Sequence, residues 1–364
     1  MDFPLGHRLS ELPGPLLLTG HTGFKGTWMT FLLEHLNVPV VGYSLPAEKD
    51  SLFDRTERTG AIPEKFADIR DYDSLDKFID QHKPSTIIHM AAQPLVLKSY
   101  EKPRETFDVN VMGTVNILDI AFKKEFVKAI IVVTTDKVYR NDNSGGAFVE
   151  TDALEGKDPY SASKVGAEAV VAAWQQIARV SGGPSIVSVR AGNVIGGGDF
   201  AENRIIPDLI RSVMFGKPIE IRNPNSTRPW QHVLDPLAGY LASADYVLAG
   251  GAENSFNFSP NSKNFSVIEV VKIARSIFHK INIVSPTEES PKRIEAEKLD
   301  IDSTRSRSVL NWVPLFTQEA AIRETFHWWQ SFMTYEESAL EICNREISTF
   351  LKSTNISSIT QEQQ

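Results

Sequence analysis

Two residues with helical spacing could carry out acid–base chemistry. Tyr160 is followed four positions later by Lys164, and on a helix this spacing places both side chains on one face. An ammonium group beside a phenol favours the phenolate and lowers a phenol pKa that is ordinarily about 10. With eight tyrosines in the chain the spacing alone is a weak signal. The pair lies one βα unit after the segment Thr135-Asp136-Lys137, described next, and this position strengthens the prediction that Tyr160 is a base for a substrate hydroxyl.

A second reactive segment, Thr135-Asp136-Lys137, directly follows the apolar run 130–133. Residues at the carboxyl end of a parallel strand face the ligand crevice of an open α/β sheet. Thr135 can hydrogen-bond a reacting hydroxyl, and Asp136 and Lys137 can donate or accept protons. The alternative is a charge pair in a solvated loop.

Three glycines, in the pattern G-x-x-G-x-x-G, connect the first apolar run to the first helical pattern. A strand-to-helix turn of this kind lets the backbone approach a pyrophosphate, which then lies at the helix N-terminus. A plain turn is the alternative, but the flanking strand and helix favour dinucleotide binding. We expect cofactor contacts from Gly20, Thr22, Gly23, Phe24, Lys25 and Gly26.

The residue that closes the second strand distinguishes NAD from NADP. An acidic residue there binds the ribose 2′-OH, and a basic one binds a 2′-phosphate. Ser44, the residue at this position, is neither acidic nor basic. Without a basic group to hold a 2′-phosphate, NAD is favoured over NADP. Asp68 and Ile69 follow the next extended segment, where a carboxylate could accept a hydrogen bond from the adenine amino group. A helix N-cap by Asp71 or Asp73 is the other reading of this segment, and the two are compatible.

Short apolar runs alternate with helical patterns throughout the first half of the chain, which predicts a doubly wound parallel (Rossmann) α/β sheet. The expected strands are 15–19, 38–43, 86–90, 127–134 and 185–190, and the expected helices are 27–36, 73–81, 103–122 and 160–180. We expect residues 1–190 to form an NAD-binding domain to which 230–256 return. Residues 191–350 would mainly form a smaller, interleaved substrate domain, and the polar segment 353–364 would be disordered. A final helical stretch is expected over 318–350.

Composition excludes several classes of function. The net charge of −8 argues against a nucleic-acid-binding face, and Cys343, the only cysteine, cannot form an internal disulfide or a cysteine metal cage. The eight histidines include no H-x-x-x-H spacing, so no metal site is expected. No apolar run approaches the ~20 residues of a membrane span, and a cytoplasmic location is the default expectation. Trp230 and Trp312 are expected in the core.

Taken together, the motifs resemble those of the extended short-chain dehydrogenases, in particular the sugar-nucleotide 4,6-dehydratases and most of all the CDP-glucose 4,6-dehydratases. The similarity runs from about Leu16 to Trp312. The motifs that carry it are GHTGFKG (20–26), HMAAQP (89–94), NVMGT (110–114), TDK (135–137), YSASK (160–164), RAGNVIGGGD (190–199) and RPWQHVLD (228–235).

The resemblance implies a reaction on enzyme-held NAD that ends without net change in the cofactor. Tyr160, helped by Lys164 and Thr135, would remove the O4 proton while hydride leaves C4. Water would then be lost across C5 and C6 with Asp136 as the acid, and the hydride would return to C6 to give a 4-keto-6-deoxy sugar. Related dTDP-glucose dehydratases have a glutamate base at the position of Lys137, so a lysine there could serve as base only if its site depressed its pKa.

The resemblance also implies binding residues and an assembly. Further cofactor contacts would come from Ala91, Ala92, Gln93 and Asn110, and substrate contacts from Asn193, Arg204, Arg228 and Asp235. Arg204 could instead only cap the helix that starts near Ile205, and Asp235 could be only an N-cap. A homodimer would form through the helices 103–122 and 160–180.

Some residues near the expected sugar-nucleotide crevice depart from the dehydratase pattern. Leu97-Lys98 stands where the pattern has arginine, and Val138-Tyr139-Arg140 stands where it has Cys-Tyr-Glu. A GDP-, UDP- or dTDP-linked substrate therefore stays open beside a CDP-linked one. A 4-epimerase or simple dehydrogenase is a second alternative, but Asp136 and Lys137 favour dehydration. A NAD-sensing protein without activity is disfavoured by the complete Tyr160–Lys164–Thr135 set.

Overall fold

A seven-stranded parallel sheet forms the centre of the computed structural model, which describes residues 5–142, 145–221, 223–260, 265–284, 299–335 and 337–361. The strand order is β11-β6-β5-β4-β1-β2-β3, and every neighbouring pair is parallel. The expected doubly wound sheet is confirmed, and its chain order reverses between β1 and β4. The strands are β1 Leu16–Thr19, β2 Val40–Ser44, β3 Glu64–Phe66, β4 Thr86–His89, β5 Ala129–Val133, β6 Ser185–Ala191 and β11 Ser255–Phe258.

Both faces of the sheet are buried, which explains why its strands are continuous apolar runs rather than alternating patterns. In β1, Leu16 and Leu18 pack into one apolar cluster and Leu17 packs into the cluster on the opposite face. The first cluster includes α2 Phe24–His35 and α10 Leu234–Leu248, and the second includes α4 Tyr72–His82, α7 Gly113–Phe122 and α8 Pro159–Ser181.

The helix expected over 103–122 is broken into α6 Pro103–Phe107, a π-helical turn at Asp108–Met112 and α7. Such turns widen a helix locally and are frequent at functional sites. The short helix α5 Val96–Glu101, which the sequence patterns did not reveal, precedes them. Short helices α1 His7–Glu11 and α3 Leu52–Arg55 lie near the N-terminus and after β2.

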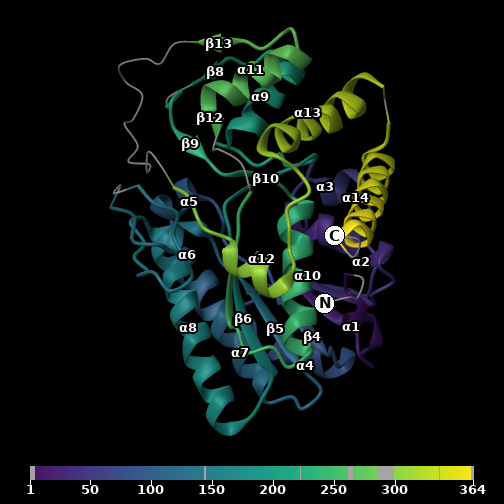
Figure 1. The fold of residues 1–364 in the computed structure, drawn as a ribbon, viewed down its shortest axis with the longest axis vertical. Helices are drawn as coiled ribbons and strands as arrows, with labels where there is room; N and C mark the ends of the chain where they lie inside the picture. The colour runs from purple at the N-terminus through teal and green to yellow at the C-terminus, as the bar shows by residue number, and fades with distance from the viewer. Residues whose placement is uncertain are drawn as a thin grey trace.

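The second half of the chain builds a smaller assembly at the carboxyl ends of the sheet, at the top of the view in Figure 1. Its helices are α9 Ile205–Phe215, α11 Val267–Ile277 and α13 Gln318–Thr334, and its short strands are β8 Ile219–Glu220, β9 Thr227–Arg228, β12 Phe265–Ser266 and β13 Ile283–Val284. Two more strands, β7 Asn193–Ile195 and β10 Trp230–His232, pair in parallel below it. In contrast, α10 packs on the large sheet and β11 extends it beside β6.

The C-terminal part differs from the sequence expectation in two ways. The single final helical stretch is divided into α13 and α14 Ala339–Gln361. Helix α14 also includes residues 353–361, which were expected to be disordered. This segment contains no proline or glycine that would end a helix. Residues 362–364 lie outside the described part. Helix α12 Thr304–Leu310 leads to Trp312, which is buried like Trp230, as expected. Among the residues described, no helix has the length and apolar character needed to cross a membrane.

Candidate functional site

The turn between β1 and α2 has space only for glycine at two of its three glycine positions. Gly20 has φ +75°, and a Cβ there would lie 2.8 Å from the Ala91 backbone nitrogen. A Cβ on Gly26 would lie 2.1 Å from the Gly20 carbonyl oxygen. Gly23 is the N-cap of α2 and has no side chain to cover the first amides of the helix. The turn therefore presents the exposed helix N-terminus that a pyrophosphate requires.

The end of β2 offers hydroxyl groups to a ribose. The Thr22 and Ser44 hydroxyl oxygens are 2.7 Å apart, and the Thr22 hydroxyl also donates to the Leu45 carbonyl at 2.9 Å. Both side chains are buried beneath the loop that follows β2. This environment suits an uncharged ribose hydroxyl better than a phosphate.

A buried histidine that the sequence analysis did not identify supports the glycine turn. The Nε2 atom of His21 is 2.8 Å from the Glu64 carboxylate on β3, and its ring stacks against Phe66. A Cβ at Gly42 would lie 2.6 Å from the ring, so the glycine in β2 provides its space. Burial lowers the pKa of His21, against the opposing effect of Glu64.

The segment after β3 confirms the capping interpretation of its acidic residues. Asp71 caps α4 by accepting a hydrogen bond from the Ser74 amide at 3.1 Å, so the N-cap expectation is confirmed for Asp71. Asp68 pairs with Arg70 at 2.6 Å, and hydrogen bonds from Arg70 lower the pKa of its carboxyl group. Ile69 is buried against Gly113. The adenine contacts of Asp68 and Ile69 stay predictions.

Gln93 and Asn110 bind each other and join the loop after β4 to the catalytic helix. The Asn110 side chain accepts from the Gln93 amide at 2.8 Å and donates to the Gln93 carbonyl at 3.1 Å. Its amide nitrogen also donates to the Ser163 hydroxyl at 2.8 Å. Ala91, whose amide donates to the Thr19 hydroxyl at 3.2 Å, and its half-buried neighbour Ala92 begin the same loop. The π-helical turn thus places Asn110 between this loop and α8.

Tyr160 is the second residue of α8, whose start is strongly determined by the sequence. Asp158 is the N-cap and forms a capping box with Ser161, and Pro159 occupies the first helical position. The Tyr160 amide donates to the Ser99 hydroxyl at 3.1 Å. The phenol is buried and hydrogen-bonded to Thr135. The expected meeting of Tyr160 and Thr135 is therefore confirmed.

The expectation that Lys164 lowers the Tyr160 pKa is wrong, because Lys164 is not among the groups that lower it. Burial raises the pKa of Tyr160, and only in part is this opposed by Lys137, the Thr135 hydrogen bond and Arg204. The Lys164 ammonium donates instead to the Val133 carbonyl at 3.0 Å. Burial lowers the pKa of Lys164 itself to about 8.

Asp136 is fully buried, and only one of its two carboxylate oxygens accepts hydrogen bonds from the residues described. Oδ1 accepts hydrogen bonds from the Thr135 hydroxyl and the Lys137 ammonium, each at 3.0 Å. Oδ2 has no hydrogen-bond partner among the residues described. The Lys137 Nζ also lies 3.4 Å from the Asn193 side-chain oxygen. The fully solvated charge pair considered above does not describe this segment, because Asp136 is completely buried while the Lys137 side chain is 33% exposed.

Gly192 and Pro229 lie beside the free oxygen of Asp136. A Cβ on Gly192 would lie 3.4 Å from Asp136 Oδ2 and 2.7 Å from the Pro229 ring. The parallel pairing of β7 with β10 places Asn193 opposite Trp230. Arg228, which ends β9, is buried and donates to the Thr227 carbonyl at 2.8 Å. The expected substrate residues Asn193 and Arg228 thus belong to neighbouring segments.

Two further cations lie close to the residues expected to be catalytic. Arg204 pairs with Asp199 at 3.0 Å and interacts electrostatically with Tyr160, so its role is not limited to the start of α9. Lys25, expected at the cofactor turn, directs its ammonium to the Tyr240 hydroxyl at 3.2 Å. Burial lowers the pKa of Lys25 to about 7, with Lys164 and Arg204 adding to the effect.

Asp235 is not part of this site. Its carboxylate oxygens accept hydrogen bonds from the backbone amides of Leu315 at 2.7 Å and Phe316 at 3.3 Å. The Trp312 indole donates to its backbone carbonyl at 2.9 Å. Asp235 therefore connects the segment before α13 to α10, and both of its carboxylate oxygens accept hydrogen bonds from backbone amides. The expected substrate contact is corrected to a structural role.

We expect Asp235→Ala to destabilise the fold by about 2 kcal/mol, because two partly buried amides lose their acceptors. Urea unfolding monitored by tryptophan fluorescence measures this loss. Turnover per folded molecule should stay at the wild-type value. A stable variant with a raised KM for the nucleotide sugar would instead restore Asp235 to the substrate site.

Sequence comparisons identify relatives along most of the chain. The profile of the family described as GDP-mannose 4,6 dehydratase matches residues 17–325. A CDP-glucose 4,6-dehydratase of Salmonella typhimurium is 37% identical, over 93% of this chain and 96% of its own length. A dTDP-glucose 4,6-dehydratase of Escherichia coli is 28% identical, over 87% of this chain and 92% of its own length.

Solved structures share the fold. The UDP-glucose 4-epimerase of Thermotoga maritima superposes with a TM-score of 0.75 at 20% identity, covering 88% of this chain and 99% of its own. A dTDP-glucose 4,6-dehydratase of Bacillus anthracis, in complex with NAD, gives 0.73 at 22% identity, covering 88% and 98%. These likenesses agree with the parallel sheet and the interleaved second assembly described above.

Proposed function

This chain belongs to the GDP-mannose 4,6-dehydratase family of extended short-chain dehydrogenases, and from that membership we propose that it is an NAD-dependent sugar-nucleotide 4,6-dehydratase acting on CDP-glucose. One observation carries the choice of reaction. The buried Asp136 has a free oxygen beside Gly192, and Tyr160 contacts the neighbouring Thr135. An acid and a phenol are therefore available to one hexose, as elimination of water requires.

The residues at the β1–α2 turn fit a dinucleotide, because Gly20 and Gly26 let the backbone of the turn pack more closely than a Cβ would allow and Gly23 leaves the start of α2 without a side-chain cap. The amides of the segment 20–26 would hold the pyrophosphate, and Ser44, Asp68 and Ile69 would hold the adenosine. Ala91, Ala92, Gln93, Asn110, Tyr160 and Lys164 would surround the nicotinamide riboside. When bound, NAD supplies a group that takes up a hydride and later gives it back.

Tyr160 takes the proton from the 4-hydroxyl group of the sugar. Burial raises the pKa of this phenol, and Lys137, Thr135 and Arg204 are the groups that favour the phenolate. Oxidation at C4 acidifies the C5 hydrogen, so the C6 hydroxyl can be eliminated. Asp136 protonates that departing hydroxyl through its free Oδ2.

Lys137 holds Asp136 in position for this step. Its ammonium bridges Asp136 Oδ1 and the Asn193 side-chain oxygen, which directs the other carboxylate oxygen toward Gly192. A charged lysine in these contacts is a hydrogen-bond donor rather than a base. For the elimination itself, we assign to Lys137 the transfer of its proton to Asp136, 3.0 Å away, after which the neutral amine accepts the C5 proton and the Asp136 carboxyl group protonates the departing C6 hydroxyl.

Substrate binding is assigned mainly to residues 191–350, and cofactor binding to 1–190 with 230–256. Asn193 would contact the sugar, and Arg228 and Arg204 would bind the diphosphate, for which a guanidinium group offers paired donors. The test is a panel of CDP-, GDP-, UDP- and dTDP-glucose with the purified protein. Formation of a 4-keto sugar, seen by its alkaline ultraviolet absorbance, is expected with CDP-glucose at the highest kcat/KM. A 4-epimer as the product would contradict the assignment.

We also propose a homodimer formed through α6, α7 and α8. Apolar side chains are exposed on these helices and on the turns between them, among them Phe107, Met112, Ile177 and Val180. Met112→Glu is expected to convert a dimer to monomers in sedimentation velocity, because a buried carboxylate would be unpaired. A monomeric wild-type protein would contradict the proposal. The cytoplasmic location stays a prediction from the sequence.

A further inference from the structure

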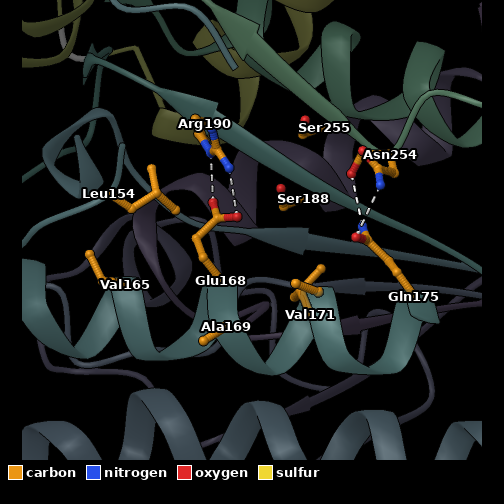
Figure 2. Close-up of a pocket in the computed structure, with 11 residues that line it drawn as sticks. Leu154, Val165, Glu168, Ala169, Val171, Gln175, Ser188, Arg190, Asn254 and Ser255 are labelled. Carbon is orange, nitrogen blue, oxygen red and sulfur yellow. Dashed lines mark hydrogen bonds and ion pairs between the residues drawn. The ribbon is translucent and has the colours of Figure 1, made fainter. Parts of the chain in front are cut away.

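Glu168 is a buried acid four residues after Lys164 on α8, and the proposed chemistry does not use it. Its side chain is 5% exposed and forms a two-pronged ion pair with Arg190 on β6, at 2.8 and 2.9 Å. Figure 2 shows these two bonds between the helix and the strand. Such a pair is costly to desolvate, so its geometry has to repay the cost through well-formed hydrogen bonds.

The pair reaches the end of β5, where the catalytic residues begin. Glu168 Oε1 accepts a hydrogen bond from the Thr134 hydroxyl at 2.6 Å. Thr134 lies between Val133, whose carbonyl accepts from Lys164, and Thr135, which bonds the Tyr160 phenol. Helix α8 is thus attached to three consecutive residues, the last of β5 and the two that follow it, and Glu168 makes the middle attachment.

We propose that Glu168, held by Arg190, is a positioning residue that fixes Tyr160 and Lys164 of α8 against Thr135 and keeps Lys164 in its charged form. This inference rests on the proposed function, since it assumes that Tyr160 and Lys164 carry out proton transfer. The hydrogen-bond partners of Glu168 in the described structure are Thr134, Ser188 and Arg190, none of which is assigned to proton transfer.

The charges around Lys164 support the second part of this proposal. Burial lowers its pKa to about 8, and Glu168 is the group that opposes this effect. From the other elements, Lys25 on α2 is a cation that interacts with Lys164, and His89 on β4 is neutral because burial lowers its pKa to about 3. Tyr160 lies one turn earlier on α8. Glu168 is therefore the anion that favours the ammonium form.

The same helix supplies a matched control. A cavity of about 300 Å³ lies between α8, β6 and β11, and both Glu168 and Gln175 line it (Figure 2). The Gln175 amide donates to the carbonyls of Ile186 and Asn254 at 3.0 and 2.9 Å. Gln175 therefore joins α8 to the sheet as Glu168 does, but it lies eleven residues beyond Lys164 and carries no charge.

The experiment is a pH profile of kcat with CDP-glucose for the wild type, Glu168→Gln, Glu168→Asp and Gln175→Ala. If activity needs charged Lys164, the rate falls as the pH rises through its pKa. Loss of the Glu168 charge lowers that pKa, so the alkaline limb of Glu168→Gln should move at least half a pH unit lower. Its kcat at neutral pH should fall about tenfold, and KM should change less than twofold. The limb should stay in place for Glu168→Asp, which keeps the charge, and for Gln175→Ala.

An alkaline limb that is unchanged in Glu168→Gln would overturn the proposal, as would an equal shift in Gln175→Ala. If Glu168→Gln does not fold, because Arg190 is left as a buried unpaired cation, the double variant Glu168→Gln, Arg190→Gln removes both charges. The same downward shift is then expected, and its absence would overturn the proposal. A wild type that forms no 4-keto sugar from any of the four nucleotide sugars would contradict the proposed function instead.

Discussion

Tyr160→Phe is expected to lower kcat by about 10³-fold while NAD binding is retained, because the ring stays and only the proton-accepting oxygen is lost. The phenol is buried and hydrogen-bonded to Thr135. Turnover is measured by the 4-keto product from CDP-glucose. NAD binding is measured separately by calorimetry.

Tyr246→Phe is the matched control for this experiment. The Tyr246 hydroxyl accepts hydrogen bonds from the amides of Ala252 and Glu253, far along the chain from the site. Its loss should leave kcat within twofold of the wild type. Near-normal turnover of Tyr160→Phe would refute the assigned role of Tyr160, and loss of NAD binding in that variant would point to a structural role.

Asp136→Asn should stop the reaction after the first oxidation. The amide oxygen can still accept from Thr135 and Lys137, so the local geometry is kept. The amide cannot donate an acidic proton to the departing C6 hydroxyl, and we expect elimination to slow by about 10²–10³-fold. Reduced cofactor should then accumulate, which stopped-flow absorbance records directly in a single turnover.

Asp245→Asn provides the comparison for a buried carboxylate outside the site. Asp245 accepts hydrogen bonds from the amides of Gly6 and Arg8, so its substitution tests the effect of altering a buried acid alone. It should not cause reduced cofactor to accumulate. If Asp136→Asn turned over at the full rate, dehydration would be the wrong reaction for this site.

Much of the fold follows from local patterns in the sequence. Continuous apolar runs such as 129–133 predict strands buried on both faces, and Leu16, Leu17 and Leu18 alternate between two apolar clusters as that prediction requires. The π-helical turn at Asp108–Met112 could not be predicted in this way. It depends on contacts of Asn110 with Gln93 and Ser163, which are distant in the sequence.

The sequence could predict those residues of the candidate site that lie within a local motif. Thr135, Asp136 and Tyr160 come together because the strand end and the helix start are both encoded locally. The pKa of Tyr160 could not be predicted from the spacing of Lys164, because burial outweighs the nearby charges. Asp235 was assigned to the substrate site because its hydrogen-bond partners could not be recognised from the neighbouring sequence. Its amide partners, Leu315 and Phe316, are about eighty residues away in the chain.

The central claim is that one hexose loses water while its C4 hydrogen returns to the same molecule. CDP-glucose carrying deuterium at C4, incubated with the enzyme and NAD, tests this claim when the product is analysed by NMR and mass spectrometry. The account predicts a 4-keto-6-deoxy sugar with the deuterium at C6 and no net reduction of the cofactor. A product that keeps the deuterium at C4, or a stoichiometric gain of reduced cofactor, would contradict it.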